Sequence, residues 1–210
     1  MKKHTVIFIL LITSILVAAC WSSNSKLAEF TYKDGYLWNA KIAYEPEYVI
    51  KPINIGGKFG YCKDEFGKNE VCEIVNEDPD EWIYVKYEKK WIAGDGQLYK
   101  AVNLPECNLD VFGVTIVEIQ GMSGTDNSKT YTITEQRTID RVIDILDSSD
   151  YKPTPDNAIL SESKLVFFLS QDFPGLRYEG ILRVDDKGNK YITNLEDASL
   201  VYEIGDLLDK

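Results

Sequence analysis

Histidine is almost absent from this chain: the one histidine among 210 residues is His4, inside the N-terminal segment. If that segment is removed, the protein has no Ser-His-Asp or Cys-His catalytic arrangement and no histidine-ligated zinc or copper site. General acid–base chemistry would then depend on Asp, Glu, Lys or Tyr. Most hydrolases that act in cell walls are thereby disfavoured, whereas enzymes that use two carboxylates, such as glycosidases, are not.

Cysteine is also scarce, with four residues in the chain. Cys62 and Cys72 flank nine residues whose Phe66-Gly67 pair is typical of a turn. The flanking segments, 58–62 and 71–75, are predicted to be adjacent antiparallel strands, where opposed residues lie within reach of a disulfide. We therefore predict a Cys62–Cys72 disulfide, as expected in an oxidising compartment. Two alternatives stay open: Cys107 pairs with either residue, or all three are buried thiols.

Metal chemistry is not expected. Three scattered cysteines without a CxxC pair or a histidine do not match the ligand spacing of zinc sites. The sequence therefore predicts no metal site, no other cofactor and no catalytic residue.

Basic residues are outnumbered, 23 against 34 acidic residues, and the net charge is −11. This balance disfavours nucleic acid and anionic lipid head groups as partners, and it favours cations or basic proteins. Solubility alone also explains such a charge.

The one long hydrophobic run is Thr5–Ala18, preceded by Lys2 and Lys3. Its length and flanks are typical of a secretory signal. The run ends in Val17-Ala18-Ala19-Cys20, which matches a lipobox, a small-residue cleavage site before a cysteine. We therefore predict a signal peptide over 1–19 and a diacylglyceryl group on Cys20, which would anchor the protein on the outer face of the cell membrane. An uncleaved spanning helix is the alternative, disfavoured because spanning takes about 20 apolar residues.

Alternating and β-branched residues predict strands through most of the remaining chain, including 113–120. The segment Asp185–Asn189, DDKGN, is predicted to be a hairpin turn. A lipidated tether is expected over 20–27, a mainly β domain over 28–121, and an α+β domain over 129–210, with turn formers between the two domains. Ile139, Val142, Ile143 and Leu146 are spaced as on one face of a helix. The expected fold class is α+β: a strand-rich N-terminal half followed by a small antiparallel sheet with one packed helix.

The lipobox, the segments EYVIKPINIGGKFGYC and AGDGQLYKAV, and the C-terminal pattern TIDRVIDIL…LVFFLS…YEGILRVDDKGNKYI together resemble uncharacterised lipoproteins of Bacillus-type Gram-positive bacteria. The part from about Lys129 to Lys210 is similar to a YhfM-like lipoprotein module. The resemblance implies an extracytoplasmic, anchored α+β module and brings no activity with it. The Cys62/Cys72 pair departs from this pattern, since cysteines are uncommon in such exported proteins.

Two features are candidates for recognition. Trp38, Trp82 and Trp91 could form a binding surface, although tryptophan also anchors small cores. The acidic run Asn76–Glu81 could be a solvated loop, a weak cation site or a contact for a basic partner.

The function expected from the sequence is therefore that of a membrane-anchored, non-enzymatic protein that binds another envelope component. The alternative is an envelope enzyme that acts on a glycan through paired carboxylates. A two-lobed solute-binding protein is disfavoured because it would need a longer chain.

Overall fold

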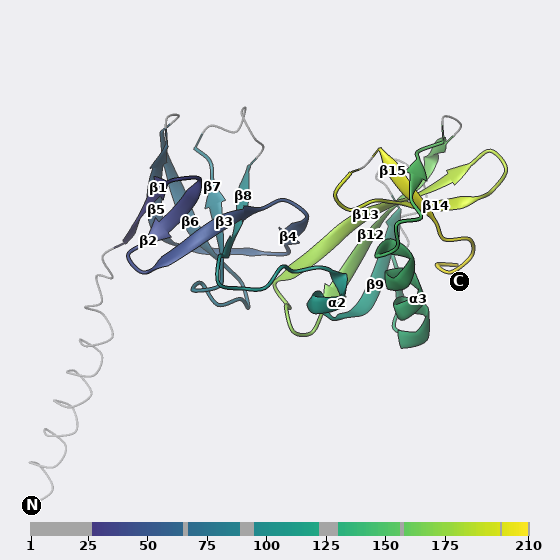
Figure 1. Cartoon of the computed structure of the whole chain (residues 1–210), viewed down its shortest axis with the longest axis horizontal. Coiled ribbons are helices and arrows are strands. Elements are labelled where there is room, and N and C mark those ends of the chain that lie inside the picture. Colours follow the sequence, from purple (N-terminus) through teal and green to yellow (C-terminus); the bar gives the residue numbers. More distant parts are fainter. Residues whose placement is uncertain are drawn as a thin grey trace, which may run out of the picture.

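The computed structural model describes residues 27–64, 67–88, 95–121, 130–155, 158–197 and 199–209, without the side chains of 158–162. The predicted signal peptide, Cys20 and Trp91 lie outside these ranges. Two sheet structures follow one another along the chain and lie side by side in Figure 1. In the part of the chain that is described, no helix has the length and apolar character needed to span a membrane.

The first structure is a closed barrel in the N-terminal half. Its described strands follow the order β1-β2-β3-β8-β7-β6-β5 around the wall. Their bounds are β1 Ala28–Lys33, β2 Tyr36–Asn39, β3 Ile42–Glu47, β5 Ile55–Asp64, β6 Gly67–Ile74, β7 Trp82–Lys86 and β8 Gly96–Ala101.

The barrel closes where β1 runs parallel to β5, with Ala28 opposite Gly60. This closure needs glycine at position 60. A Cβ atom there would lie 2.6 Å from the Phe30 ring and 2.8 Å from the Ala28 carbonyl oxygen. The other neighbouring strands of the barrel pair antiparallel. Two of the barrel contacts join strands that are not consecutive in the chain, β1 with β5 and β3 with β8.

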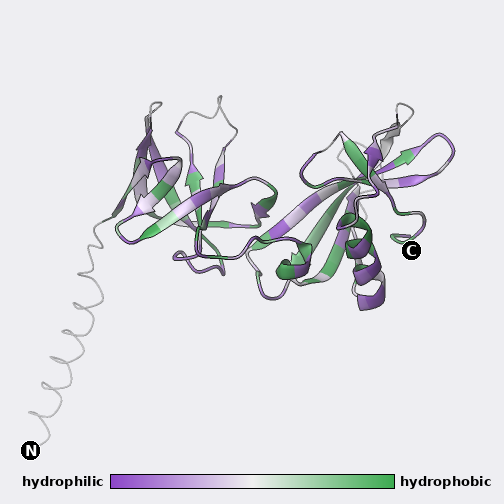
Figure 2. Ribbon diagram, viewed as in Figure 1, coloured by the Kyte–Doolittle hydropathy of each residue, from purple (hydrophilic) through white to green (hydrophobic). Residues whose placement is uncertain are grey.

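The barrel interior is filled by alternate residues of its strands, as a closed sheet requires. Tyr32 and Tyr99 meet inside it, with their hydroxyl oxygens 3.1 Å apart. Figure 2 shows the resulting alternation of hydrophilic and hydrophobic positions along the barrel strands. The buried residues of this core are Phe30, Leu37, Tyr44, Cys62, Val71, Ile83, Val85, Tyr99 and Ala101.

The second structure is a sheet with the strand order β10-β9-β12-β13-β14-β15-β11. The described residues of this part include the helices α2 Leu109–Phe112 and α3 Gln136–Leu146. The strands are β9 Val114–Gly121, β10 Tyr131–Ile133, β11 Lys152–Pro153, β12 Ala158–Ser170, β13 Leu176–Asp185, β14 Lys190–Thr193 and β15 Leu200–Glu203.

Helix α3 was predicted correctly from the spacing of its apolar residues. All four of them, Ile139, Val142, Ile143 and Leu146, are buried in the core of the second sheet. The hairpin turn after β13 also forms where DDKGN predicted it. Asp185 Oδ1 accepts hydrogen bonds from the backbone N of Lys187 and of Asn189, and Gly188 has a φ of 85°.

Strand β4, Ile50–Pro52, connects the two structures. It follows barrel strand β3 in the chain, but it pairs with β13 of the second sheet, with Ile50 opposite Tyr178. One hydrophobic core extends across this joint and includes residues of the outer barrel wall. From the barrel side it takes Ile50, Ile74, Trp82, Tyr84 and Leu98, and from the other side Phe112, Phe168, Leu176 and Tyr178, among others.

The predicted α+β class is wrong. Of the residues that the structure describes, about 55% are in strands and 9% in helices, and the architecture is a closed barrel plus a second sheet, which makes it essentially all-β. Helix α3 does pack on the second sheet, but it covers only 11 residues. Strand pairs and strand side chains supply most of the remaining core.

The sheets do not divide at the predicted boundary between 121 and 129. Strand β9 lies before that boundary, yet it pairs with β10 and β12 of the second sheet. Strand β4 also lies before that boundary and pairs with β13 of the second sheet.

The predicted Cys62–Cys72 disulfide is also wrong. The β5–β6 register places Cys62 opposite Asn69 and Cys72 opposite Lys58. Cys62 is four residues from Lys58 along β5, about 13 Å at the usual rise per residue, which is too far for a disulfide. The side chains also face opposite ways, because Cys62 lies in the barrel core and Cys72 is paired with Tyr84 of the outer wall. Cys62, Cys72 and Cys107 are free thiols.

Candidate functional site

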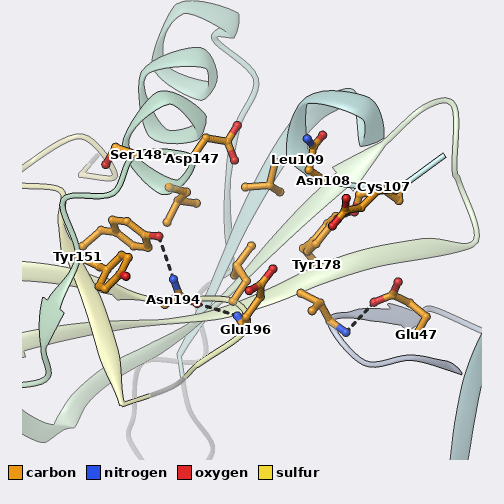
Figure 3. Close-up of a pocket in the computed structure, with 15 residues that line it drawn as sticks. Glu47, Cys107, Asn108, Leu109, Asp147, Ser148, Tyr151, Tyr178, Asn194 and Glu196 are labelled. Carbon is orange, nitrogen blue, oxygen red and sulfur yellow. Dashed lines mark hydrogen bonds between the residues drawn. The ribbon is translucent and has the colours of Figure 1, made fainter.

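A pocket of about 410 Å³ lies where the barrel meets the second sheet. Its walls come from the end of β3, the segment before α2, the end of α3, β13, the β14–β15 connection and β15. Figure 3 shows Asp147, Glu196 and Glu47 on three different sides of this space.

The segment before α2 forms one wall and is held next to the helix by hydrogen bonds at Cys107 and Asn108. Asn108 is the N-cap of α2, and its Oδ1 accepts a hydrogen bond of 2.9 Å from Val111 N, as capping residues do. Tyr178 on β13 donates a hydrogen bond from its hydroxyl to the Cys107 carbonyl oxygen. Leu109 is buried in the shared core. This wall is therefore tied to the sheet rather than being a loose loop.

The C-terminal end of α3 supplies Asp147 and Ser148. The Ser148 hydroxyl donates to the Ile145 carbonyl oxygen at 2.7 Å and closes the last turn. Partial burial, together with the nearby charges of Asp110 and Asp144, raises the pKa of Asp147 above its usual value. A carboxylate is also unfavourable at a helix C-terminus, where the helix dipole is negative. Asp147 therefore stands where a positive charge would be stabilising.

The β14–β15 connection presents Glu196. Asn194 organises this turn, because its Oδ1 accepts from the backbone N of Glu196 at 2.9 Å. The Asn194 amide donates to the hydroxyl of Tyr202, also at 2.9 Å. Tyr202 packs edge-on against Tyr151, with ring centroids 6.1 Å apart. A fixed turn and two aromatic rings thus form the wall opposite the barrel.

The barrel contributes Glu47 at the end of β3. Its Oε1 accepts hydrogen bonds from Val49 N at 2.8 Å and from Ile50 N at 3.3 Å. The carboxylate is therefore oriented by Val49 of the β3–β4 turn and by Ile50, the first residue of β4, the strand that joins the barrel to the second sheet.

The chemistry of the pocket is anionic and aromatic. The described side chains lining it include four carboxylates and three tyrosines, and no lysine or arginine. The carboxylates are Glu47, Glu106, Asp147 and Glu196, and the tyrosines are Tyr151, Tyr178 and Tyr202. Such walls suit an organic cation, which carboxylates attract and tyrosine rings can cover.

A metal ion and a reactive thiol fit the pocket less well. Within the described ranges, no three His, Cys, Asp or Glu side chains are grouped closely enough to hold a metal ion. Burial, and next the negative charge of Glu47, raise the pKa of Cys107 to about 11. The Cys107 thiol is therefore protonated at neutral pH and is a poor nucleophile.

The described residues that the sequence suggested for recognition lie outside the pocket. Trp38 is 40% exposed on the barrel, whereas Trp82 is 1% exposed and packs edge-on against Phe173 in the joint. In the acidic run, Asp78 Oδ1 accepts from Asp80 N as in an ordinary polar turn. Glu77 of the same run accepts a hydrogen bond from Gly175 across the joint.

Sequence reasoning missed the pocket because its residues come from segments spread between 47 and 202. None of these segments is a motif on its own. The nearest signal was Asp147, an acid at the end of a predicted helix, where a basic residue is usual.

No protein family, curated protein or solved structure matches this chain. The similarity to YhfM-like lipoproteins accordingly stays a prediction, and the pocket is interpreted from its own geometry.

Proposed function

We propose that this chain is a non-enzymatic binding protein whose ligand is an organic cation. The cation binds in the pocket between the barrel and the second sheet. A lipid on Cys20 anchors the protein to the outer face of the cell membrane. The observation that carries the binding site is the set of four carboxylates converging from separate elements on one tyrosine-lined space. The lipobox at Val17–Cys20 supports the location.

The electrostatics of the pocket support a cationic ligand. Asp144 and Asp147 both lie near the C-terminal end of α3, and Asp110 is close enough to raise the pKa of Asp147 further. Asp110 and Asp144 do not line the pocket, but their negative charges act on Asp147, which does, and a cation bound beside Asp147 would offset this repulsion. A protein retains such an unfavourable arrangement most readily where function requires it.

The binding site is tested by calorimetric titration of the whole protein with trilysine and with spermidine. Trilysine acetylated on all three Nε atoms, which lacks the side-chain charges, is the matched control ligand. We expect both cations to bind, and more weakly as salt is added, while the acetylated peptide does not bind. Asp147→Asn and Glu196→Gln should each weaken binding at least about threefold, since charge-assisted contacts are stronger than neutral ones. Glu29→Gln, an exposed barrel residue outside the pocket, should leave binding unchanged.

The anchor is tested separately by replacing Cys20 with Ala in cells. We expect the protein to leave the membrane fraction, because the acyl chains attached through Cys20 would hold it there. Full retention of the variant in that fraction would contradict lipid anchoring.

A second function, glycan cleavage by a carboxylate pair, is favoured by one observation. Asp147 has a raised pKa, as a general acid requires, and it lies in a pocket with other carboxylates. Release of reducing sugar from purified cell-wall glycan by the protein, and its loss in Asp147→Asn, would favour this function over binding alone.

A further inference from the structure

The outer wall of the barrel carries a group of lysines that contrasts with the acidity of the chain. Strands β5, β6 and β7 are neighbours, and their outward residues include Lys58, Lys63, Lys68 and Lys86, all exposed. We call these four residues the lysine face. Cys62 and Val85 of the same strands lie in the barrel core, so the next residues, Lys63 and Lys86, point outward. Lys68 lies opposite Lys63, and a register shift after Lys58 places Lys58 opposite Cys72 of the outer wall.

The positive charge of this face is only partly neutralised. Glu70 lies among the lysines, paired with Lys58 at 3.0 Å and opposite Lys86 in the β6–β7 register. The Lys68 ammonium lies 3.9 Å from the centre of the Tyr61 ring, so an aromatic face rather than an acid supports it. Lys63 and Lys68 are direct cross-strand partners, an arrangement of like charges that destabilises a hairpin.

Three of these lysines, Lys58, Lys68 and Lys86, line a groove of about 370 Å³ together with Glu70 and Glu88. Lysine ammonium groups bind phosphate as point charges. The groove therefore fits a phosphate-bearing, anionic surface.

The beginning of the described chain brings this face close to the predicted anchor. Ala28 begins β1 and pairs with Gly60 on β5, two residues from Lys58. Seven residues, 21–27, separate Cys20 from β1, and they can span at most about 25 Å. A lipid on Cys20 thus keeps the barrel within about 25 Å of the bilayer.

We infer that the lysine face is the side of the protein that rests on anionic phospholipid head groups. This inference rests on the proposed lipid anchor. The net charge of −11 disfavours free binding to such a surface, so the lysines determine orientation and the lipid supplies attachment. β1 lies on the side of the barrel away from the second sheet (Figure 1), so this orientation leaves the acidic pocket open to cations from outside.

The test is lysine acetylation of the lipidated whole protein on vesicles, followed by peptide mass spectrometry. One vesicle preparation contains phosphatidylglycerol and phosphatidylcholine in equal parts, and the other contains phosphatidylcholine only. We expect Lys58, Lys63, Lys68 and Lys86 to react at least about threefold more slowly on the anionic vesicles. Lys187, an exposed residue of the β13–β14 turn, should react equally on both. At about 1 M salt the protection should disappear, since screening then acts within about 3 Å.

A charge-reversal variant tests whether the positive charge of the lysine face causes the protection. Lys63→Glu combined with Lys68→Glu changes two exposed side chains and should abolish the protection of Lys58 and Lys86. Lys187→Glu is the matched control and should leave the protection intact. Circular dichroism shows that each variant is folded.

Equal acetylation rates on both vesicle types would overturn the inference. Protection by soluble polyphosphate but not by anionic vesicles would overturn it in favour of a soluble polyanion. A failed anchor is distinguishable from both results, because the protein would then not float with either vesicle.

Discussion

Glu77 and Gly175, 98 positions apart in the chain, are joined by a hydrogen bond of 2.6 Å from the Gly175 backbone N to Glu77 Oε1. Gly175 is packed so closely that a Cβ atom there would lie 2.4 Å from the Val75 carbonyl oxygen. The loop after β6 and the loop before β13 therefore contact each other directly. This contact, the pairing of β4 with β13, and the shared core hold the barrel against the second sheet.

The first prediction concerns Glu77. Burial is the main cause of its raised pKa, while the bond from Gly175 opposes the shift. The charged form is thus disfavoured in the folded state, so this group stabilises the fold most when it is protonated, and that stability is lost as the pH rises through the folded-state pKa. Glu77→Gln should therefore match or exceed the wild type in urea unfolding at pH 7, and this gain should disappear in acid.

Glu77→Ala is the informative comparison. It leaves the buried Gly175 N–H without its acceptor and should cost about 1–3 kcal/mol at pH 7. If Glu77→Ala and Glu77→Gln were equally stable, the bond to Gly175 would not contribute to the joint.

The second prediction concerns barrel closure. Gly60→Ala should destabilise the fold by about 1–3 kcal/mol, because the added methyl meets both the Phe30 ring and the backbone of β1. Gly57→Ala on the same strand is the matched control, since no atom lies within 4 Å of its added Cβ. Thermal unfolding followed by circular dichroism measures both. Equal melting temperatures would mean that β1 and β5 are not so closely paired.

The third prediction concerns the thiols. Denatured protein, kept without reductant, should take up alkylating reagent at Cys62, Cys72 and Cys107, and prior reduction should add no further site. In the folded protein, Cys62 should react slowly, because burial raises its pKa to about 11 and the side chain is fully enclosed. If the protein took up additional alkylating reagent only after reduction, seen as an increase in its mass, a disulfide would be present that the β5–β6 register does not allow.

The fourth prediction concerns a trade-off in the pocket. Asp147→Asn should raise stability at pH 7 by a few tenths of a kcal/mol, because it removes repulsion from Asp110 and Asp144. The same change should weaken cation binding. Because the pKa of Asp147 is raised in the folded state, the charged carboxyl destabilises the wild type at neutral pH. The stability gain of the variant is therefore present at neutral pH and is lost as acid protonates the wild-type carboxyl. Asp150→Asn, an exposed acid outside the pocket lining, should affect neither quantity.

Much of the local structure could be predicted from the sequence, because local patterns determine it. The spacing of Ile139 and Leu146 with their neighbours identified α3, and DDKGN identified the turn that follows β13. The run at 113–120 was correctly predicted as a strand, although its pairing in the second sheet was not. Periodicity reveals which residues share a face, but it does not reveal which strand lies alongside.

The larger errors have the same origin. Barrel closure depends on β1 meeting β5, and the joint depends on β4 leaving the barrel for β13. Neither pairing has a turn signal, because the partners are not consecutive strands. The pocket was missed for the same reason, since Glu47, Asp147 and Glu196 are brought together by this long-range pairing. The disulfide prediction failed because it assumed that Cys62 and Cys72 lie opposite each other in the hairpin. The actual register places Cys62 opposite Asn69 and Cys72 opposite Lys58, and the sequence does not reveal this register.

The position of β4 has a consequence for proteolysis. The chain passes from the barrel to the second sheet a second time after β8, through exposed residues near Pro105. A protease that cuts this crossing would not release either half. The N-terminal fragment would keep a strand inserted in the neighbouring sheet, and Trp82 would still be covered by Phe173. The nicked protein would migrate as two bands under denaturing conditions and as one particle in solution.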